Sequence, residues 1–251
     1  MNKTEILYGI HPVSEAIKAG RRKVYEVYIA KSKNSKRFAD IIKLAESMRI
    51  PVKTVESSHL EKIADSAFNQ GIGAKTSIYP LLPFDDILKQ ITPEHKDFFL
   101  LLDNIVDPQN LGSLVRTALC AGVSGVIITK DRSALPTPAV SKASAGALEH
   151  AHVSVVTNMV SAIKILKDKG IWIAGMDATA DMPVYKCDLS GPVALVVGSE
   201  GKGIRPLVKV NCDFLVSIPQ KDSISSLNAS AAGAVAMYEA FRQRHHPDIY
   251  K

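Results

Sequence analysis

Residues 98–116 read FFLLLDNIVDPQNLGSLVR, so that an apolar run, a polar loop and the first turns of a helical pattern follow one another. The run 98–102 is apolar at every position, which is typical of a strand buried on both faces. Similar runs recur at 125–129, 152–156, 171–175, 193–197 and 214–218, and helical patterns occur at 110–121, 137–148, 159–169 and 227–244. This alternation predicts an α/β domain with a parallel sheet flanked by helices.

The first third of the chain has a different pattern. Strand patterns occur at 24–29 and 52–55, and helical patterns at 13–19, after Ser35 and at 57–64. These residues predict a small α/β domain over 1–75. The Pro80-Leu81-Leu82-Pro83 segment indicates a break, so we expect a linker over 76–95 and a larger domain over 96–251.

The composition excludes several classes of protein. The chain has 251 residues, 46% of them hydrophobic and 22% charged, which excludes a disordered or fibrous chain. The three cysteines, Cys120, Cys187 and Cys212, lie far apart without a CxxC pair, which disfavours a disulfide scaffold and suits a reducing cytosol. The apolar runs are too short to span a bilayer, and the first residues do not resemble a signal peptide. We therefore expect a soluble cytoplasmic protein without a membrane partner.

The net charge of +6 is unevenly distributed. Residues 1–75 contain 14 Lys and Arg against 8 Asp and Glu, whereas residues 76–251 contain 17 of each kind. The candidate RNA contacts are basic residues of the first third: Arg21, Arg22, Lys23, Lys33, Lys36 and Arg37. A basic module beside a neutral one is typical of a polyanion-binding protein, although charge alone fits an ordinary solvated surface equally well.

Three loops that follow strands carry candidate chemistry, because ligands of parallel sheets bind beyond the carboxyl ends of the strands. In the first loop, Asn110 stands where the helix is expected to begin and could cap it, and Arg116 follows six residues later. A simple cap and a surface arginine would produce the same pattern. The second loop, GSEGKG at 198–203, fits neither GxGxxG nor a P-loop, which leaves a glycine-rich turn for a flat ligand with Glu200 inside it.

The third loop, IPQKDSISSLNAS at 218–230, leads into an alanine-rich helix. Its apolar stripe consists of Leu227, Ala231, Val235, Tyr238 and Phe241. The small residues around this stripe predict either a subunit contact or tight internal packing, and the two remain open.

Metal chemistry and nucleophilic catalysis have no support in the sequence. His150 and His152 stand two residues apart, and no third ligand with metal-site spacing accompanies them. No GxSxG segment is present, and nothing pairs a cysteine with a particular histidine.

Taken together, the loops resemble the signature of the SpoU (TrmH) branch of the SPOUT RNA methyltransferases. The matching stretches are DPQNLGSLVRTALCAG, LVVGSEGKG and IPQKDSISSLNASAA, and YGIHPVSEAI is similar to the opening of the family's RNA-binding domain. DNIVDPQNLGSLVRTA and KDRSALPTPAVSKASAGALE most resemble the subgroup that methylates a guanosine 2′-hydroxyl in large-subunit ribosomal RNA. Two positions depart from the family pattern: Asn69 stands where many members have His, and Gln220 where related members have Met.

The resemblance implies a catalytic domain with a parallel sheet and a C-terminal trefoil knot, an exception to the rule against threaded chains. It also implies S-adenosyl-L-methionine as the cofactor, held near Gly198, Gly201, Ile218 and Leu227, no metal, and a homodimer with the active site at the subunit contact. By the same resemblance the catalytic residues are Arg116, Asn110, Glu200, Ser226 and Asn228.

The implied reaction is an in-line attack of a ribose 2′-oxygen on a sulfonium methyl group, and the site must align the reacting atoms and manage a weakly acidic proton. A guanidinium stays protonated in proteins, so we favour a cationic Arg116 that stabilises the developing alkoxide over an arginine that acts as a base. The alternatives are a transfer-RNA 2′-O-methyltransferase of the same branch and a non-catalytic RNA-binding or ribosome-assembly protein.

Overall fold

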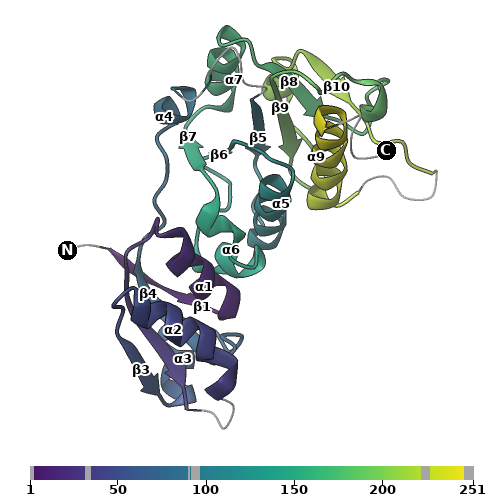
Figure 1. The fold of residues 1–251 in the computed structure, drawn as a ribbon. Helices are drawn as coiled ribbons and strands as arrows, with labels where there is room; N and C mark the ends of the chain where they lie inside the picture. The colour runs from purple at the N-terminus through teal and green to yellow at the C-terminus, as the bar shows by residue number, and fades with distance from the viewer. Residues whose placement is uncertain (1–2, 32–34, 90, 92–96, 222–226, 246–251) are drawn as a thin grey trace. The chain divides into compact units, whose positions relative to one another are not determined.

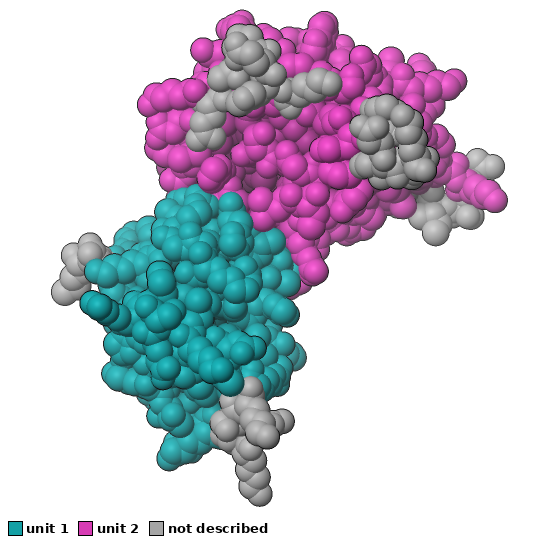
Figure 2. Space-filling model, viewed as in Figure 1, with its two compact units in different colours: residues 1–80, 136–150 teal, residues 81–135, 151–251 magenta. Residues whose placement is uncertain are grey.

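The computed structural model describes residues 3–31, 35–89, 91, 97–221 and 227–245. The chain forms two compact units, coloured separately in Figure 2. Unit 1 contains Met1–Pro80 and Pro136–His150, and unit 2 contains Leu81–Leu135 and Ala151–Lys251. The segment 136–150 thus packs with the N-terminal part of the chain, although the sequence suggested no boundary on either side of it.

Unit 1 is built on a four-stranded sheet in the order β1-β4-β2-β3. The strands are β1 (Thr4–Tyr8), β2 (Val24–Ala30), β3 (Val52–Val55) and β4 (Ile72–Ser77). β4 runs antiparallel to β1 and β2, and β3 runs parallel to β2. The helical elements of this unit are α1 (Ile10–Ala19), η1 (Ser35–Phe38), α2 (Ala39–Ser47), α3 (Ser57–Ala64), α6 (Pro138–Ala143) and η2 (Ala147–His150).

The sequence predicted an α/β unit here, and that prediction is confirmed, but it missed two strands. β1 is short and partly polar, and β4 reads IGAKTS, which has little strand propensity of its own. β4 nevertheless lies inside the sheet, because its backbone pairs with a strand on each side. The expected linker from residue 76 therefore begins within β4, and it contains the short helix α4 (Phe84–Leu88).

Unit 2 is built on a six-stranded sheet in the order β10-β8-β9-β5-β6-β7, and all of its strand pairs are parallel. The strands are β5 (Phe98–Asp103), β6 (Gly125–Thr129), β7 (Val153–Val156), β8 (Trp172–Met176), β9 (Val193–Gly198) and β10 (Phe214–Val216). The remaining helical elements are α5 (Pro108–Cys120), α7 (Met159–Asp168), η3 (Val184–Lys186), α8 (Pro206–Lys209) and α9 (Ala229–His245). This confirms the parallel α/β domain and each of the six predicted strands within a few residues.

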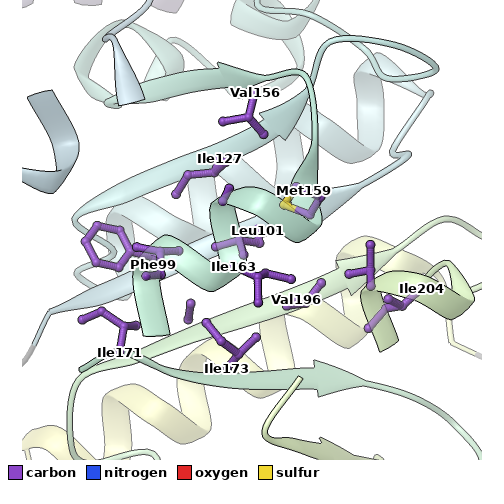
Figure 3. Close-up of a cluster of buried hydrophobic side chains, with 14 of the residues drawn as sticks. Phe99, Leu101, Ile127, Val156, Met159, Ile163, Ile171, Ile173, Val196 and Ile204 are labelled. Atoms are coloured by element: carbon purple, nitrogen blue, oxygen red, sulfur yellow. The ribbon is translucent and has the colours of Figure 1, made fainter. Parts of the chain in front are cut away.

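Helices cover the sheet of unit 2 on both faces. On one face, Met159 and Ile163 of α7 pack against Phe99 and Leu101 of β5 (Figure 3). On the other face α5 and α9 lie side by side (Figure 1), so close that a Cβ atom on Gly233 would lie 2.4 Å from a methyl carbon of Leu114. Internal packing against α5 therefore explains why α9 has a small residue at position 233.

Two local expectations were wrong. The single helix predicted at 137–148 is broken into α6 and η2, because Ala145 and Gly146 both adopt positive φ angles, 51° and 84°. The apolar run at 171–175 predicts a core position for Trp172, but this residue lies at the start of β8 with 58% of its surface exposed and stacks on Phe214. Among the helices of the described ranges, none has the length and apolar character needed to cross a bilayer.

Candidate active site

The start of α5 places Asn110 inside unit 2. The helix begins at Pro108, and the side chain of Asp107 caps it by accepting a hydrogen bond from the Gln109 N–H at 3.0 Å. The expectation that Asn110 caps this helix was therefore wrong, because the cap lies three residues earlier. Only 8% of Asn110 is exposed, and its amide is free to point at a neighbouring segment.

Three of the predicted catalytic residues form one hydrogen-bonded group. Asn110 Nδ2 donates to Glu200 Oε1 at 3.0 Å, and Asn228 Nδ2 donates to Asn110 Oδ1 at 2.9 Å and also to Glu200 Oε1. Asn228 Oδ1 in turn accepts hydrogen bonds from the Ser230 and Ala231 N–H groups at the start of α9. We call Asn110, Glu200 and Asn228 the amide–carboxylate cluster; it joins the segments after β5, after β9 and before α9.

The glycine-rich loop after β9 folds back on itself. Ser199 and Gly203 exchange backbone hydrogen bonds of 3.1 and 2.9 Å, and Gly201 and Gly203 adopt φ angles of 74° and 64°. A Cβ atom on Gly198 would lie 2.1 Å from the carbonyl carbon of Gly203. A side chain at this position is therefore impossible without moving the loop, which explains why the segment needs glycine there.

A cavity of about 520 Å³ opens beside this loop. All four predicted cofactor residues line it: Gly198, Gly201, Ile218 and Leu227. Glu200 also lines the cavity, so the amide–carboxylate cluster forms part of its wall. The volume lies within the range of small-molecule sites, and the mixture of apolar side chains, glycine backbone and a carboxylate fits a ligand with a flat ring and a positive charge. The residues present thus suit S-adenosylmethionine.

The sequence did not identify one wall of this cavity. Asp177 and Thr179, which follow β8, line it together with Lys209. Burial alone would raise the pKa of Asp177, but hydrogen bonds from Lys209 and Thr179 outweigh burial and lower the pKa to about 2. The same rule that singled out the other loops, a polar segment directly after a strand, could have found Asp177.

A buried ion pair that the sequence also did not identify anchors the glycine-rich loop. Asp103, at the end of β5, is fully buried and accepts hydrogen bonds from the Arg205 backbone N–H and Nε, both at 2.8 Å. Arg205 Nη2 lies 2.6 Å from the same carboxylate. Because Arg205 follows the loop directly, Asp103 holds the end of the segment that carries Glu200.

Arg116 is not bonded to the amide–carboxylate cluster in the described part of the chain. Its side chain is exposed on α5, and within the described part of the chain it forms no hydrogen bond or ion pair. Ser226, the fifth predicted catalytic residue, lies outside the described residues. One chain therefore brings together three of the five predicted catalytic residues.

The predicted RNA-binding residues of unit 1 differ in their surroundings. Arg22 is buried, donates to Glu149 Oε2 at 2.6 Å and also pairs with Glu5, so the expectation that it contacts RNA does not hold. Its charge is neutralised inside the unit, where Arg22, two residues before β2, binds Glu149 of the segment 136–150. Arg21 is half-buried and donates to the Tyr79 hydroxyl and the Pro80 carbonyl.

The other predicted RNA contacts lie nearer the surface. Lys23 and Arg37 are exposed, and Lys23 lies over the Tyr25 ring at 5.2 Å. Lys33 lies outside the described residues, and for Lys36 only the backbone, in η1, is described.

Two of the three cysteines are unsuited to thiol chemistry, and the described residues form no group that could bind a metal ion. Burial raises the pKa of Cys187 to about 11 and that of Cys212 to about 12, which keeps both thiols protonated. His150 pairs with Glu15, 2.9 Å away, rather than with a second metal ligand. Among the residues that the structure describes, no group of three His, Cys, Asp or Glu side chains could hold a metal ion.

Comparisons with known proteins agree with this site. The model of the SpoU rRNA Methylase family matches residues 97–238, and the model of the RNA 2′-O ribose methyltransferase substrate-binding domain matches residues 6–82. The chain is 37% identical to the 23S rRNA (guanosine-2′-O-)-methyltransferase RlmB of Shewanella oneidensis, over 97% of this chain and 99% of the relative. It is 36% identical to RlmB of Escherichia coli K12, over 96% and 99%.

Solved structures share the fold over nearly the whole chain. The AdoMet-bound SpoU methyltransferase AviRb of Streptomyces viridochromogenes matches with a TM-score of 0.78 and 26% identity, over 96% of this chain and 90% of AviRb. An AdoMet-bound rRNA methyltransferase of Sinorhizobium meliloti matches with a TM-score of 0.79 and 22% identity, over 98% and 88%, which bears on the fold alone. The chain therefore belongs to the SpoU family of S-adenosylmethionine-dependent RNA 2′-O-ribose methyltransferases.

Proposed function

We propose that this enzyme methylates the 2′-hydroxyl of a guanosine in large-subunit ribosomal RNA. The observation that carries the proposal is the amide–carboxylate cluster in the wall of the glycine-lined cavity, because it joins a cofactor site to polar groups that can orient a second reactant. The ribosomal target is supported by relatives of the same length that are named for it. In this proposal residues 1–75 bind the RNA, 76–95 link the domains and 96–251 catalyse the reaction in the cytoplasm.

The residues around the cavity divide the work. Gly198, Gly201, Ile218 and Leu227 would hold S-adenosylmethionine, which supplies a methyl group on a positively charged sulfur when bound. The two amides hold Glu200 through its Oε1 atom, and within the described residues its Oε2 atom accepts no hydrogen bond. Glu200 can therefore orient a ribose hydroxyl or a cation through that oxygen, and Ser226 completes the group in this proposal.

Arg116 supplies the positive charge in this mechanism. Its guanidinium stays protonated, grips the phosphate next to the target and stabilises the alkoxide that develops on the 2′-oxygen. Because Arg116 is exposed and has no hydrogen bond or ion pair within the described residues, its guanidinium is available to an RNA phosphate.

The enzyme works as a homodimer in this proposal. The outward stripe of α9 supports it: Tyr238 is 50% exposed, and Ala231 is exposed on the same face. This stripe is separate from the face of α9 that packs on α5, so a second copy can cover it. The C-terminal trefoil knot implied by the family resemblance belongs to the same proposal.

The test measures methyl transfer from labelled S-adenosylmethionine to 23S ribosomal RNA and to bulk transfer RNA in parallel. We expect label in the ribosomal RNA, on a guanosine whose 3′ phosphodiester resists alkaline cleavage because its 2′-oxygen is methylated. Label in transfer RNA alone would replace the proposed substrate, whereas cofactor binding without transfer to any RNA would favour a non-catalytic RNA-binding role.

A further inference from the structure

Two cations of unit 1, Lys142 and Arg37, lie close enough to repel each other, and neither has a carboxylate partner in the described ranges. Lys142 of α6 donates a hydrogen bond of 2.6 Å to the amide oxygen of Gln70, and Arg37 of η1 is exposed nearby. Neither side chain forms an ion pair with any residue in the described ranges. Elsewhere in this unit, lysines such as Lys31 and Lys53 do pair with glutamates.

The surroundings of Lys142 make its charge costly. Burial and, after it, repulsion from Arg37 lower the pKa of Lys142. A half-buried ammonium beside a second cation is destabilised until an anion approaches, and an RNA phosphate supplies that anion while it releases counterions.

An exposed aromatic ring lies in the adjoining loop. Phe68 is 81% exposed, the largest value among the exposed large hydrophobic residues described. The loop that carries it is ordered by Asn69, whose Oδ1 atom accepts from the Gly71 N–H at 2.8 Å and whose Nδ2 atom donates to the Ser66 carbonyl at 2.9 Å. The ring is thus held out into solvent on a well-bonded loop, as a base-stacking platform would be.

The loop and η1 are in direct contact. A Cβ atom on Gly71 would lie 3.2 Å from the ring of Phe38, the residue after Arg37. Gln70, the neighbour of Gly71, binds Lys142. Arg37, Phe68 and Lys142 therefore project from elements that touch one another, although they come from three distant parts of the sequence.

We propose that Arg37, Phe68 and Lys142 form one surface that binds single-stranded RNA, with the two cations on phosphates and the ring on an unpaired base. We call these three residues the RNA-contact surface. The proposal rests on the proposed function for the nature of the substrate, and it adds to the basic residues predicted from the sequence a lysine from the segment 136–150 and an aromatic residue. An unpaired segment is the form of RNA that fits, because a paired base cannot stack on a side chain.

The test is direct binding of transcribed 23S ribosomal RNA to the full-length enzyme at several salt concentrations. Lys142→Gln and Arg37→Gln should each weaken binding and reduce the slope of log K against log salt by about 0.7, the value for one single-strand phosphate contact. Phe68→Ala should weaken binding by about tenfold without changing that slope, because stacking is not electrostatic. Phe68→Trp should restore the affinity.

Lys53→Gln is the matched control. It also removes one lysine charge from unit 1, but Glu26 already neutralises that charge. Equal losses for Lys53→Gln and Lys142→Gln, or unchanged affinity in both Phe68→Ala and Arg37→Gln, would overturn the proposal. Both Phe68 and Arg37 are exposed, so these variants test it even where Lys142→Gln impairs folding.

S-adenosylmethionine affinity should stay within twofold of the wild type in every variant. An enzyme whose surface binds this RNA as expected but which methylates only transfer RNA would refute the proposed function and leave the surface intact.

Discussion

At the scale of single residues, the site holds one carboxylate in place without an ion pair. Glu200 Oε1 accepts hydrogen bonds from two asparagine amides, so its charge stays available to a ligand while its position is determined from both sides. An amide donor orients a carboxylate without cancelling its charge, which a lysine would do. This explains why both partners of Glu200 are asparagines in a cavity that suits a cationic cofactor.

Replacing Asn110 by Ala should reduce kcat by at least 100-fold, because Glu200 and Asn228 then lose a shared partner in a preorganised group. The melting temperature should fall by only a few degrees, since each of the two hydrogen bonds that are lost contributes about 1 kcal/mol. Single-turnover methylation and thermal unfolding measure the two effects. A variant that retains more than half of the activity would show that the cluster is structural.

Arg116→Ala should abolish turnover and leave stability unchanged, because the side chain is exposed on α5. Arg116→Lys, which retains the charge but not the planar fork, should recover part of the activity. The pH–rate profiles of Arg116→Lys and the wild type address the role of Arg116. A titrating step that disappears only in the variant would indicate that Arg116 acts as a base rather than as a permanent cation.

Asp177 should make stability depend on pH at the acid end. Its pKa is lowered to about 2 in the folded protein, from 3.8, so its stabilisation is complete above about pH 4 and is lost as the pH falls toward 2. Asp177→Asn should therefore melt below the wild type at pH 6, and the difference should disappear near pH 2. Melting curves at half-unit pH intervals measure this, and a constant difference down to pH 2 would contradict it.

At the scale of elements, the ends of the strands do the positioning. β5 ends in Asp103 and β9 ends in Gly198, and these residues lie opposite each other in the register of the sheet. Asp103 then holds Arg205, and Gly198, which has no side chain, allows the backbone of Gly203 to lie against it. The loop with Glu200 is therefore held at both of its ends by the sheet.

Asp103→Asn should loosen this loop and raise the Kd for S-adenosylmethionine about tenfold, because Arg205 loses its charged partner. Calorimetry with the cofactor measures the effect, and RNA affinity should remain unchanged. Asp213→Asn is the control. Like Asp103, Asp213 pairs with a basic side chain and accepts a hydrogen bond from a backbone N–H, here those of Lys167 and Ile173. Equal losses of cofactor affinity in both variants would show a general loss of stability.

At the scale of the whole molecule, the chain forms two units, and their division does not follow the order of the sequence. Residues 136–150 lie within the match to the SpoU family model but pack in unit 1, where Glu149 binds Arg22. Arg22 and Glu149 are both buried, so the pair is stable only when both partners are present. A segment of the catalytic sequence thus becomes part of the N-terminal fold and brings Lys142 with it.

Tyr238→Arg should convert the enzyme to a monomer and abolish methylation, because a charge on the outward stripe of α9 cannot be buried against a second copy. Light scattering after gel filtration measures the mass. Ile165→Arg is the control, since Ile165 is similarly exposed on α7. Wild-type enzyme that is monomeric and fully active at assay concentration would contradict the homodimer.

The sequence by itself determined the parallel sheet of unit 2. Each of its buried strands is a short, continuous apolar run that must be covered on both faces, as residues 98–102 and 193–197 illustrate. It also placed Asn110, Glu200 and Asn228 in loops after strands and at a helix start, and the tertiary structure brought the three together. The order of the strands, the weakly patterned β4, the burial of Arg22 and the clamp between Asp103 and Arg205 were decided only by the tertiary structure. Each of these depends on a partner about 50 or more residues away, such as Glu149 for Arg22, and local patterns carry no information about such partners.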